Sequence, residues 1–476
     1  MMISAWMNCR YALGCLFTST AAGRARRYAL SSLLLILGFW GGWLAAVPAL
    51  AWQTPATVQR EAQFERLLAG ARAHGSVRVI VEFDTPLVPA LAEAERSERF
   101  AAVRERLIAR LAAFRPSVLK RFRLLPLLAA RLGPEAVAFL RTLPAVRAVY
   151  EDVAVRPTVA ASQALPGSSA AATAGFTGAD WTVAVLDTGV DRAHPFLSGK
   201  VVSEACYSTT DPEQGYTSTC PGASESSVAP GSAEPCVAAA GCDHGTHVAG
   251  IAVGRAPDFS GVARDASLIA MQVFTYSEGG LVALYSDLIL GLERVYALRN
   301  DFKIAAVNMS LGGGQFSAPC DSNPLKPAID LLRSAGIATV IASGNDASSG
   351  ALSAPACIST AVSVGASTVT DTVASFSNSA KFLTILAPGE NITSAIPGGA
   401  YIENTGTSMA APHVVGAWAL MKQKDPGASV TRIRDALVRS GRPLTDTRNG
   451  LTKPRLQIDA ALGVVAGAPE AERAGN

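Results

Sequence analysis

The sequence predicts an α/β fold for the larger, C-terminal part of the chain: a doubly wound, mostly parallel sheet flanked by helices. Apolar runs of strand length alternate there with stretches of helical apolar spacing. Strands that are apolar on both faces are typical of parallel sheets covered by helices on each side. The strand runs are 181–187, 267–274, 303–311, 338–343 and 361–366, and the helical patterns are 281–300 and 325–336.

A different pattern precedes this sheet, over residues 52–157, which contain no cysteine and are rich in Arg, Glu and Ala. Alternating and helical apolar spacings follow one another in this segment. The expected elements are strands at 77–83, 124–132 and 146–152 and helices at 92–113 and 133–143. Their order predicts a small α+β domain that is separate from the larger sheet.

A small, polar stretch containing Pro and Gly joins the two domains. Such a composition predicts an exposed linker and a site of proteolytic cleavage. We place the linker at 158–176, the second domain at 177–463, and an Ala/Gly/Glu-rich disordered tail at 464–476. A net charge of +3, spread along the chain, gives no reason to expect a nucleic-acid partner.

The N-terminus predicts export. Arg24, Arg26 and Arg27 precede an apolar run at 29–51 that ends in the small-residue exit Ala-Leu-Ala. A basic flank, an apolar core and a small-residue exit indicate a secretory signal peptide, which we place at 1–51. We therefore expect a secreted, extracellular protein without stable membrane association after signal removal. The alternative is an uncleaved membrane anchor, since the run is long for a signal core, and with it a periplasmic or surface-anchored location.

Cysteine usage agrees with export. An even number of cysteines in an exported segment predicts disulfides, and the spacing lacks the closely spaced pairs of a structural zinc site. We expect a Cys320–Cys357 bridge. The other four cysteines are expected to staple a Ser/Gly/Pro-rich insertion at 203–242, and they are Cys206, Cys220, Cys236 and Cys242.

Four polar residues of the second domain follow strands or open helices. Asp187 ends a strand run, His244 opens a small-residue helical pattern, Asn345 follows another strand run, and Ser408 lies at a predicted helix start. Each also has a structural interpretation. Asp and Asn are common turn residues, and Ser at a helix start is a common N-cap. No single residue among them decides between structure and chemistry.

A metal site is an alternative for His244 and His247, because histidines three residues apart can share one helical face. The zinc-protease signature, however, needs a Glu beside the first His and a second His four residues later. Position 245 is Gly. We therefore assign no metal ligand, and we expect His247 and His413 to be structural residues.

Taken together, the four residues meet the needs of acyl transfer: a nucleophile, a base, a carboxylate that orients the base, and an oxyanion donor. Asp, His and Ser follow one another in the chain order known from subtilisin. Five ordered blocks resemble the signature blocks of the subtilases, the subtilisin-like serine proteases, within about residues 177–460. They are VAVLDTGVD (183–191), HGTHVAG (244–250), NMSLGGG (308–314), ASGN (342–345) and GTSMAAPHV (406–414).

The resemblance implies a role for each matching residue. Ser408 would attack the scissile carbonyl, His244 would act as general base and then acid, and Asp187 would orient the imidazole. Asn345 and the backbone N–H of Ser408 would form the oxyanion hole, at the positive end of the helix that begins there. The strand edge that would pair with an extended substrate is Ser310, Leu311 and Gly312.

The segment 52–157 more weakly resembles the subtilase pro-domain, an inhibitor and folding chaperone. The resemblance thus implies a secreted serine endopeptidase that is made as a self-processing zymogen, acts on protein or peptide substrates and is a monomer. We expect its maturation cleavage within 156–163. The alternative is a catalytically inactive secreted binding protein of the same fold, which would require the loss of a site residue, and none is lost.

Two features depart from the simplest subtilisins. The segment 251–266 is compact and poor in carboxylates, so the calcium loop often found there looks shortened. We expect no required cofactor, and Ca²⁺ binding stays open without a located site. The second departure is the Cys-rich insertion at 203–242. For Asp346 we weigh a place at the rim of the first specificity pocket against a solvated turn, and we favour the turn.

Overall fold

The computed structural model describes residues 55–85, 92–158, 175–237 and 240–465. The predicted signal peptide, nearly all of the predicted linker and most of the predicted tail lie outside these residues. We call residues 55–158 the N-terminal region and residues 175–465 the C-terminal region. Within the described residues, no helix is both long and apolar enough to span a bilayer.

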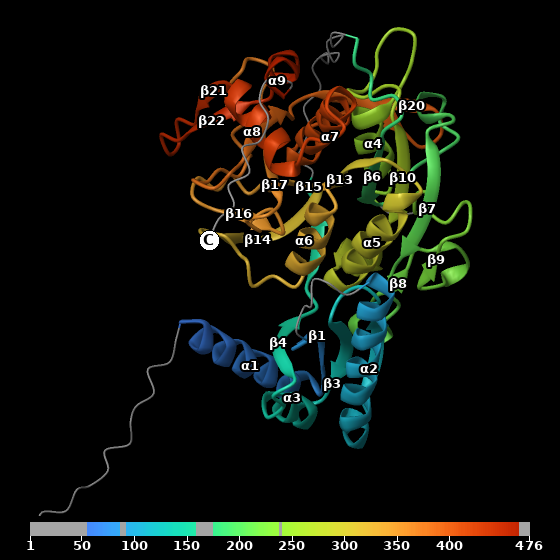
Figure 1. Ribbon diagram of the computed structural model, residues 1–476, viewed down its shortest axis with the longest axis vertical. Coiled ribbons are helices and arrows are strands. Elements are labelled where there is room, and N and C mark those ends of the chain that lie inside the picture. The colour runs from blue at the N-terminus through green and yellow to red at the C-terminus, as the bar shows by residue number, and fades with distance from the viewer. Residues whose placement is uncertain (1–54, 86–91, 159–174, 238–239, 466–476) are drawn as a thin grey trace, which may run out of the picture. The chain divides into compact units, whose positions relative to one another are not determined.

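The C-terminal region contains the predicted sheet, which confirms the α/β fold (Figure 1). Its order is β21-β22-β18-β17-β15-β13-β6-β10-β7-β9, and the pairs from β22 to β7 are parallel. The strands are β6 (Thr182–Asp187), β7 (Val201–Tyr207), β9 (Ser226–Ser227), β10 (Ser267–Gln272), β13 (Ile304–Met309), β15 (Ala338–Ala342), β17 (Val362–Ser367), β18 (Ile385–Pro388), β21 (Arg442–Thr445) and β22 (Thr452–Arg455).

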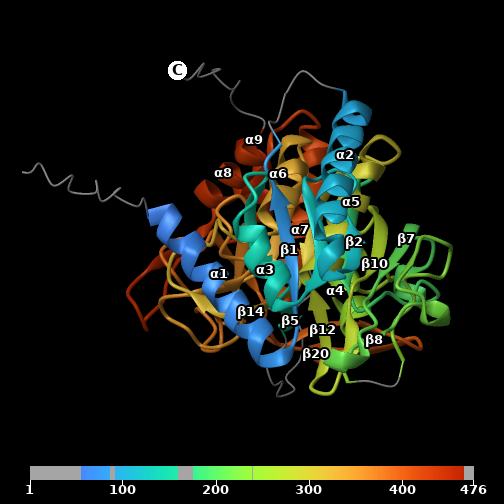
Figure 2. The ribbon, with the colours of Figure 1, turned by 90° about the horizontal axis from the view of Figure 1, so that it is seen from below.

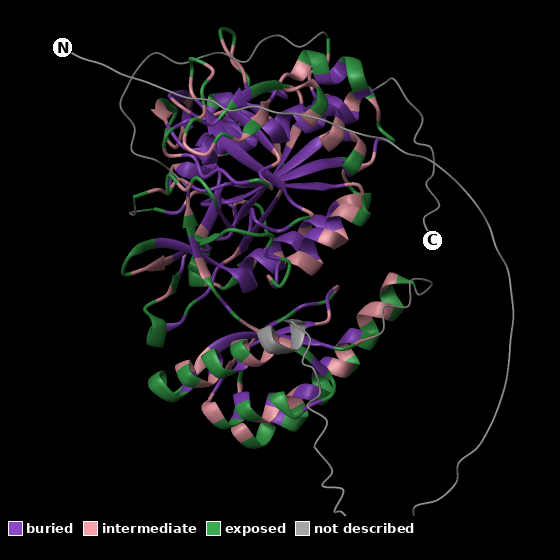
Figure 3. Ribbon diagram, turned by 90° about the vertical axis from the view of Figure 1, so that its left-hand side faces the viewer, coloured by how far each residue is buried: buried purple, intermediate pink, exposed green. Residues whose placement is uncertain are grey.

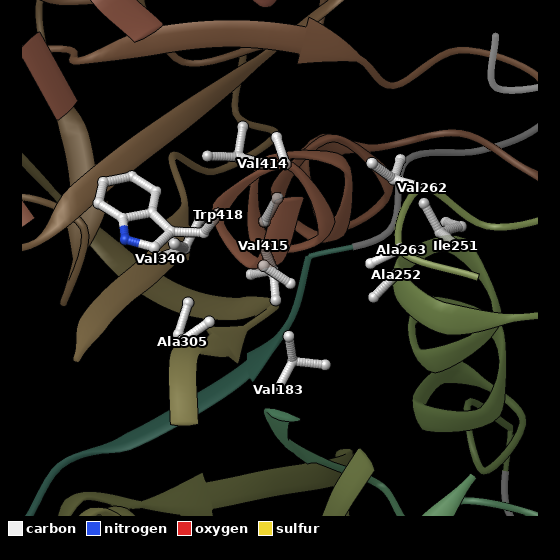
Figure 4. Close-up of a cluster of buried hydrophobic side chains, with 14 of the residues drawn as sticks. Val183, Ile251, Ala252, Val262, Ala263, Ala305, Val340, Val414, Val415 and Trp418 are labelled. Atoms are coloured by element: carbon white, nitrogen blue, oxygen red, sulfur yellow. The ribbon is translucent and has the colours of Figure 1, made fainter. Parts of the chain in front are cut away.

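Helices cover both faces of this sheet, so its central strands are buried throughout (Figure 3). Along β6, Val183 and Val185 belong to the apolar cluster that contains residues of α4 (His244–Val253) and α7 (Thr407–Lys424). Figure 4 shows side chains of α7 facing Val183 and Val340. The alternate β6 residues lie in a second cluster with α5 (Tyr285–Ala297) and α6 (Lys326–Ser334). Helices α8 (Val430–Ser440) and α9 (Ile458–Val465) complete the first layer.

Two predicted boundaries were wrong. The run 303–311 contains a break, because β13 ends at Met309 and a separate strand, β14 (Leu311–Phe316), leaves the parallel sheet. The helical pattern 281–300 begins as a strand, β12 (Gly280–Leu284), and only then becomes α5. A short apolar run fits both periodicities, and here pairing with β11 (Thr275–Ser277) decides in favour of a strand.

The N-terminal region is a four-stranded antiparallel sheet with helices. Its strand order is β2-β3-β1-β4, and Figure 2 shows the helices on the near side of the sheet. The elements are α1 (Pro55–His74), β1 (Val77–Phe83), α2 (Glu93–Leu111), β2 (Ser117–Arg121), β3 (Leu127–Leu132), α3 (Pro134–Arg141) and β4 (Val146–Glu151). The prediction missed α1 and the short, charged β2, and it began β3 three residues early.

A further sheet contains strands from both regions, in the order β16-β14-β5-β12-β11-β8. Strand β5 (Ala154–Pro157) ends the N-terminal region and lies between β14 and β12, antiparallel to each. The remaining strands are β16 (Leu352–Ala354), β8 (Thr217–Ser218) and the hairpin β19 (Ile392–Ile396) with β20 (Ala400–Asn404). Short 3-10 helices lie at 112–114, 195–197, 212–214, 221–223 and 298–300.

The disulfides join Cys206 to Cys220, Cys236 to Cys242, and Cys320 to Cys357. The expected Cys320–Cys357 bridge is therefore confirmed, and the other four cysteines pair within the insertion. The Cys236–Cys242 bridge closes the loop that immediately precedes α4, so it restrains the chain just before His244.

Candidate active site

Asp187 and His244 form a buried pair at the carboxyl end of β6. Each residue is at most 1% exposed, and His244 Nδ1 lies 2.7 Å from Asp187 Oδ1. The same carboxylate oxygen accepts a hydrogen bond from the backbone N–H of Thr188. When the imidazole is neutral and Nδ1–H donates to the carboxylate, Nε2 is left as a proton acceptor.

Glycines allow the strand end and the helix to approach each other. Gly189 has a φ of 97°, a conformation that favours glycine. A Cβ atom on Gly245 would overlap the carbonyl oxygen of Gly189. The backbone N–H of Gly245 donates to Thr188 Oγ1. The small residues of HGTHVAG therefore hold α4 against the turn that follows Asp187.

Ser408 lies in the first turn of α7, and it is not the helix cap that its sequence position suggested. The N-cap is Gly406, which has no side chain that could accept a capping hydrogen bond. The Ser408 hydroxyl instead donates to Ser310 O at 3.1 Å and lies 2.6 Å from Thr158 Oγ1. The backbone N–H of Ser408 points to Thr158 O, 3.3 Å away. This N–H belongs to the end of the helix where free N–H groups gather.

Asn345 is oriented by the residue before Ser408. Its Oδ1 accepts hydrogen bonds from both the N–H and the hydroxyl of Thr407, each at 2.9 Å. The opposite end of the amide, Nδ2, is buried and has no hydrogen-bond partner among the described residues. A buried donor without a partner is costly in a folded protein and therefore calls for an explanation. A free N–H donor beside a helix N-terminus is suited to bind a developing negative charge.

The structure forms two groups of contacts, Asp187 with His244 and Asn345 with Thr407 beside Ser408, on helices α4 and α7 that pack against each other. His244 Nε2 is buried, and no described atom forms a hydrogen bond with it. The Ser408 hydroxyl is engaged by Thr158 and Ser310 instead. The two atoms that acyl transfer requires to be free, His244 Nε2 and Asn345 Nδ2, are thus both buried and unpaired.

The predicted substrate edge pairs with an extended strand, and that strand is the chain's own β5. Leu311 lies opposite Pro157, and Gly312 lies opposite Arg156. Ser310 O accepts a hydrogen bond from Thr158 N at 3.3 Å. Antiparallel pairing of this kind binds a peptide through its backbone and leaves specificity to pockets for its side chains.

Sequence reasoning missed two parts of this arrangement. The first is Thr158, which fills the space next to Ser408 although it lies 250 residues away in the chain. The second is the opposite edge β12, where Ala283 pairs with Val155. The double glycine before the apolar run 281–284 was the available signal for β12, and it indicated a turn into a strand.

Asp346, the residue after the oxyanion candidate, is exposed. Its Oδ2 accepts a hydrogen bond from Asn378 Nδ2 at 2.9 Å and lies 3.3 Å from Ser353 Oγ. Ser353 in turn lies next to Gly312, where an added Cβ would be 3.1 Å from Ser353 Cβ and 3.8 Å from Thr158 Cγ2. Asp346 is therefore linked through its Ser353 contact to the residues that lie near the Thr158 side chain.

His247 is buried and His413 is partly buried. Burial is the main cause that lowers the pKa of each to about 4. His413 Nδ1 bonds to Met409 O at 2.8 Å, and His247 Nε2 bonds to Ile402 O at 3.2 Å. Both are neutral near pH 7 and serve packing, as predicted. In the described parts of the chain, no group of three or more His, Cys, Asp or Glu side chains is arranged to hold a metal ion.

A buried Asp–His pair, a serine at a helix N-terminus and a free amide beside it are the parts that a serine hydrolase site requires. Comparison with known proteins agrees, since residues 178–457 match the subtilase family. The chain is 35% identical to Subtilisin E of Bacillus subtilis (strain 168), over 67% of this chain and 76% of that protein. It is 36% identical to Alkaline protease of Shouchella clausii, over 69% and 78%. With Subtilisin of Bacillus pumilus the identity is 36%, over 55% and 84%.

The chain therefore belongs to the subtilase family of serine proteases.

Proposed function

We propose that this protein is a secreted serine endopeptidase that acts through an acyl-enzyme and is made as a self-processing zymogen. One observation carries the proposal. The end of the N-terminal region lies in the site as a substrate would, with Thr158 O facing the Ser408 N–H and Thr158 N bonded to Ser310 O. The roles of Asp187, His244, Ser408 and Asn345 are part of the proposal.

In this mechanism the Ser408 hydroxyl gives its proton to His244 Nε2 as its oxygen attacks the carbonyl carbon. Asp187 stabilises the imidazolium that forms. The carbonyl oxygen becomes negative and is bound by the Ser408 N–H and by Asn345 Nδ2. The imidazolium then protonates the leaving amine, an ester to Ser408 remains, and water hydrolyses this ester by the same steps.

We place self-cleavage at the Thr158–Val159 bond, which lies within the predicted 156–163 and starts the mature chain at Val159. The residue whose carbonyl faces the nucleophile is the one that would become the acyl group. The β5 strand pairs with both β14 and β12, so the chain upstream of this bond is held as an extended substrate.

After cleavage, the N-terminal region would stay bound as an inhibitor, because its β5 strand still occupies the cleft. Contacts outside the cleft support this role. Asp152 Oδ1 accepts the backbone N–H of Ser286 at the start of α5, at 2.9 Å. Glu293 accepts the N–H groups of Arg123 and Leu124, at 3.1 and 2.7 Å. From here on we call residues 55–158 the pro-domain and residues 175–465 the catalytic domain.

The test compares wild-type precursor with Ser408→Ala and, as a matched control, Ser349→Ala, which changes an exposed serine. We expect wild type and the control to be cleaved, with a new N-terminus at Val159, and to hydrolyse casein. Ser408→Ala should stay full length and inactive. If all three remain full length and none hydrolyses casein, the chain is instead the inactive binding protein of the same fold. N-terminal sequencing of the protein in the medium also tests export.

A further inference from the structure

Two arginines face each other on one surface of the pro-domain sheet. Arg78 of β1 and Arg131 of β3 are direct cross-strand partners. Their strand neighbours Val79 and Ala130 point to the opposite face, where they belong to the pro-domain's own apolar cluster. Like charges directly opposite each other in a sheet destabilise it. An anion between the two arginines would therefore stabilise this face of the pro-domain sheet.

That anion is Asp211 of the catalytic domain. Arg78 Nη1 lies 2.9 Å from Asp211 Oδ2, and Arg131 Nη2 contacts the same oxygen. The Arg78 and Asp211 side chains are 4% and 1% exposed. Burial acts to raise the pKa of Asp211, but hydrogen bonds from Arg131 and Arg78 outweigh it, so the pKa falls below its ordinary value. Asp211 is thus an ionised carboxylate held between the buried guanidinium group of Arg78 and the partly buried one of Arg131.

The loop that carries Asp211 is restrained. The Cys206–Cys220 disulfide closes it, and Asp211 and Tyr216 exchange two backbone hydrogen bonds of 2.9 Å within it. Glu213, on the same loop, lies 2.5 Å from Arg131 Nη1. The disulfide therefore does more than staple the insertion, because the loop that it closes presents the Asp211 carboxylate at a fixed place against the pro-domain.

A second ion pair lies beside the first. Lys120 Nζ of β2 lies 3.1 Å from Asp287 Oδ1, and the Asp287 side chain is fully buried. Thr209, on the disulfide-closed loop, donates to Asp287 Oδ2 at 2.7 Å. The buried charges balance only across the interface. The pro-domain contributes Arg78, Arg131, Lys120 and Asp152, and the catalytic domain contributes Asp211 and Asp287.

We propose that the loop closed by Cys206–Cys220 is a second docking surface for the pro-domain, separate from the substrate cleft. The partner that it fits is an antiparallel strand pair with two cross-strand arginines. This inference rests on the proposed zymogen. Loss of Asp211 leaves Arg78 with Asp152 and Arg131 with Glu213 but removes the anion that they share across the interface. Loss of a buried interfacial ion pair mainly speeds dissociation. The loop thereby sets how long the cleaved pro-domain is retained and favours this chain's own pro-domain over one without the arginine pair.

The test uses full-length precursor that cleaves itself. We compare wild type with Asp211→Asn, Arg131→Gln and a matched control, Asp258→Asn, which changes an exposed carboxylate. Native mass spectrometry follows the pro-domain fragment that remains bound. Active sites are counted with a serine-directed inhibitor, so that changes in turnover do not enter the result.

We expect Asp211→Asn to release the fragment at least about tenfold faster than wild type. Arg131→Gln should release it faster by a smaller factor, because Arg78 still reaches Asp211. Asp258→Asn should match wild type. Equal release from all four chains would overturn the proposal. If Asp211→Asn does not fold, the comparison of Arg131→Gln with wild type decides.

An uncleaved wild-type chain would instead count against the proposed function. The docking surface is then tested in the uncleaved Ser408→Ala chain by hydrogen exchange of β1 and β3. Faster exchange on adding Asp211→Asn, but not on adding Asp258→Asn, would support the surface. Unchanged exchange in both would overturn it.

Discussion

The two domains bury their sheets in different ways. In the catalytic domain, alternate residues of β6 enter two apolar clusters, and helices of the same domain cover both faces. In the pro-domain, Val79 and Val81 of β1 pack with the domain's own helices. The opposite face carries Ile80, which belongs to the cluster of α5 and α6 in the catalytic domain, and Arg78, which pairs with Asp211. One face of the pro-domain sheet is thus completed by the catalytic domain.

This difference between the two sheets is what the proposed zymogen would need, since its pro-domain must leave after cleavage. The described disulfides all lie in the catalytic domain, which is what the proposed secretion would favour. A sheet whose second face is covered only by its partner should lose stability when it leaves. The catalytic domain should keep most of its stability, because most residues of its two apolar clusters are its own.

The largest expected effect concerns the catalytic domain alone. Asp187→Asn should leave the packing of both domains intact but lower kcat by about 10⁴-fold, the loss measured for the equivalent change in another serine protease. An amide in place of the carboxylate no longer fixes the His244 tautomer. Steady-state hydrolysis of a peptide amide and a thermal melt check this. A loss of activity accompanied by a large fall in melting temperature would instead assign Asp187 to structure.

A smaller loss is expected from Asn345→Ala, which removes the unpaired Nδ2. Removing an oxyanion donor lowers kcat by about 10²–10³-fold, a magnitude that was itself measured on a subtilisin. KM should change little, because the donor acts mainly on the transition state. Asn449→Ala, an Asn whose Nδ2 already bonds to Ser349 O, is the control and should keep kcat. A change confined to KM would contradict the oxyanion role.

His247 and His413 should make the catalytic domain sensitive to acid. The pKa of His247 and of His413 falls from 6.5 to about 4 on folding, so each stabilises the fold above pH 6.5 and loses this contribution as the pH falls toward 4. The loss amounts to about 3 kcal/mol for each histidine at most. Thermal melts of the Ser408→Ala chain across this range should show it, and His413→Gln should flatten the dependence. An unchanged dependence in His413→Gln would contradict the assignment.

The smallest expected effect on stability tests most directly whether the pro-domain sheet and the catalytic sheet are buried independently. Ile80→Val on the pro-domain's outer face and Ile269→Val in β10 make the same change at residues that are both fully buried. Each should cost about 1 kcal/mol. In the Ser408→Ala chain, we expect Ile80→Val to increase hydrogen exchange in β1 and Ile269→Val to increase it in β10. If each change affects both domains equally, the two domains unfold as one unit and the contrast between them is wrong.

The sequence predicted the parts of this protein that depend on neighbouring residues. Continuous apolar runs predicted β6, β10, β13, β15 and β17, because a strand buried on both faces has no polar alternation. Errors occurred where a local pattern allowed two outcomes. The run 281–284 fits a helix or a strand, and pairing with β11 made it a strand. Likewise, Ser408 resembled a helix cap, but Ser310 and Thr158 engage its hydroxyl.

By itself, the sequence determined the class of fold, the family and the candidate residues, since periodicity and motif spacing are local properties of the chain. Only the tertiary structure decided that Thr158 lies against Ser408, 250 residues away, and that Arg78 meets Asp211, 133 residues away. Contacts at such separations leave no periodic trace in the sequence. They depend on strand register and on burial, which bring a charge or a peptide bond to its partner only once both domains have folded.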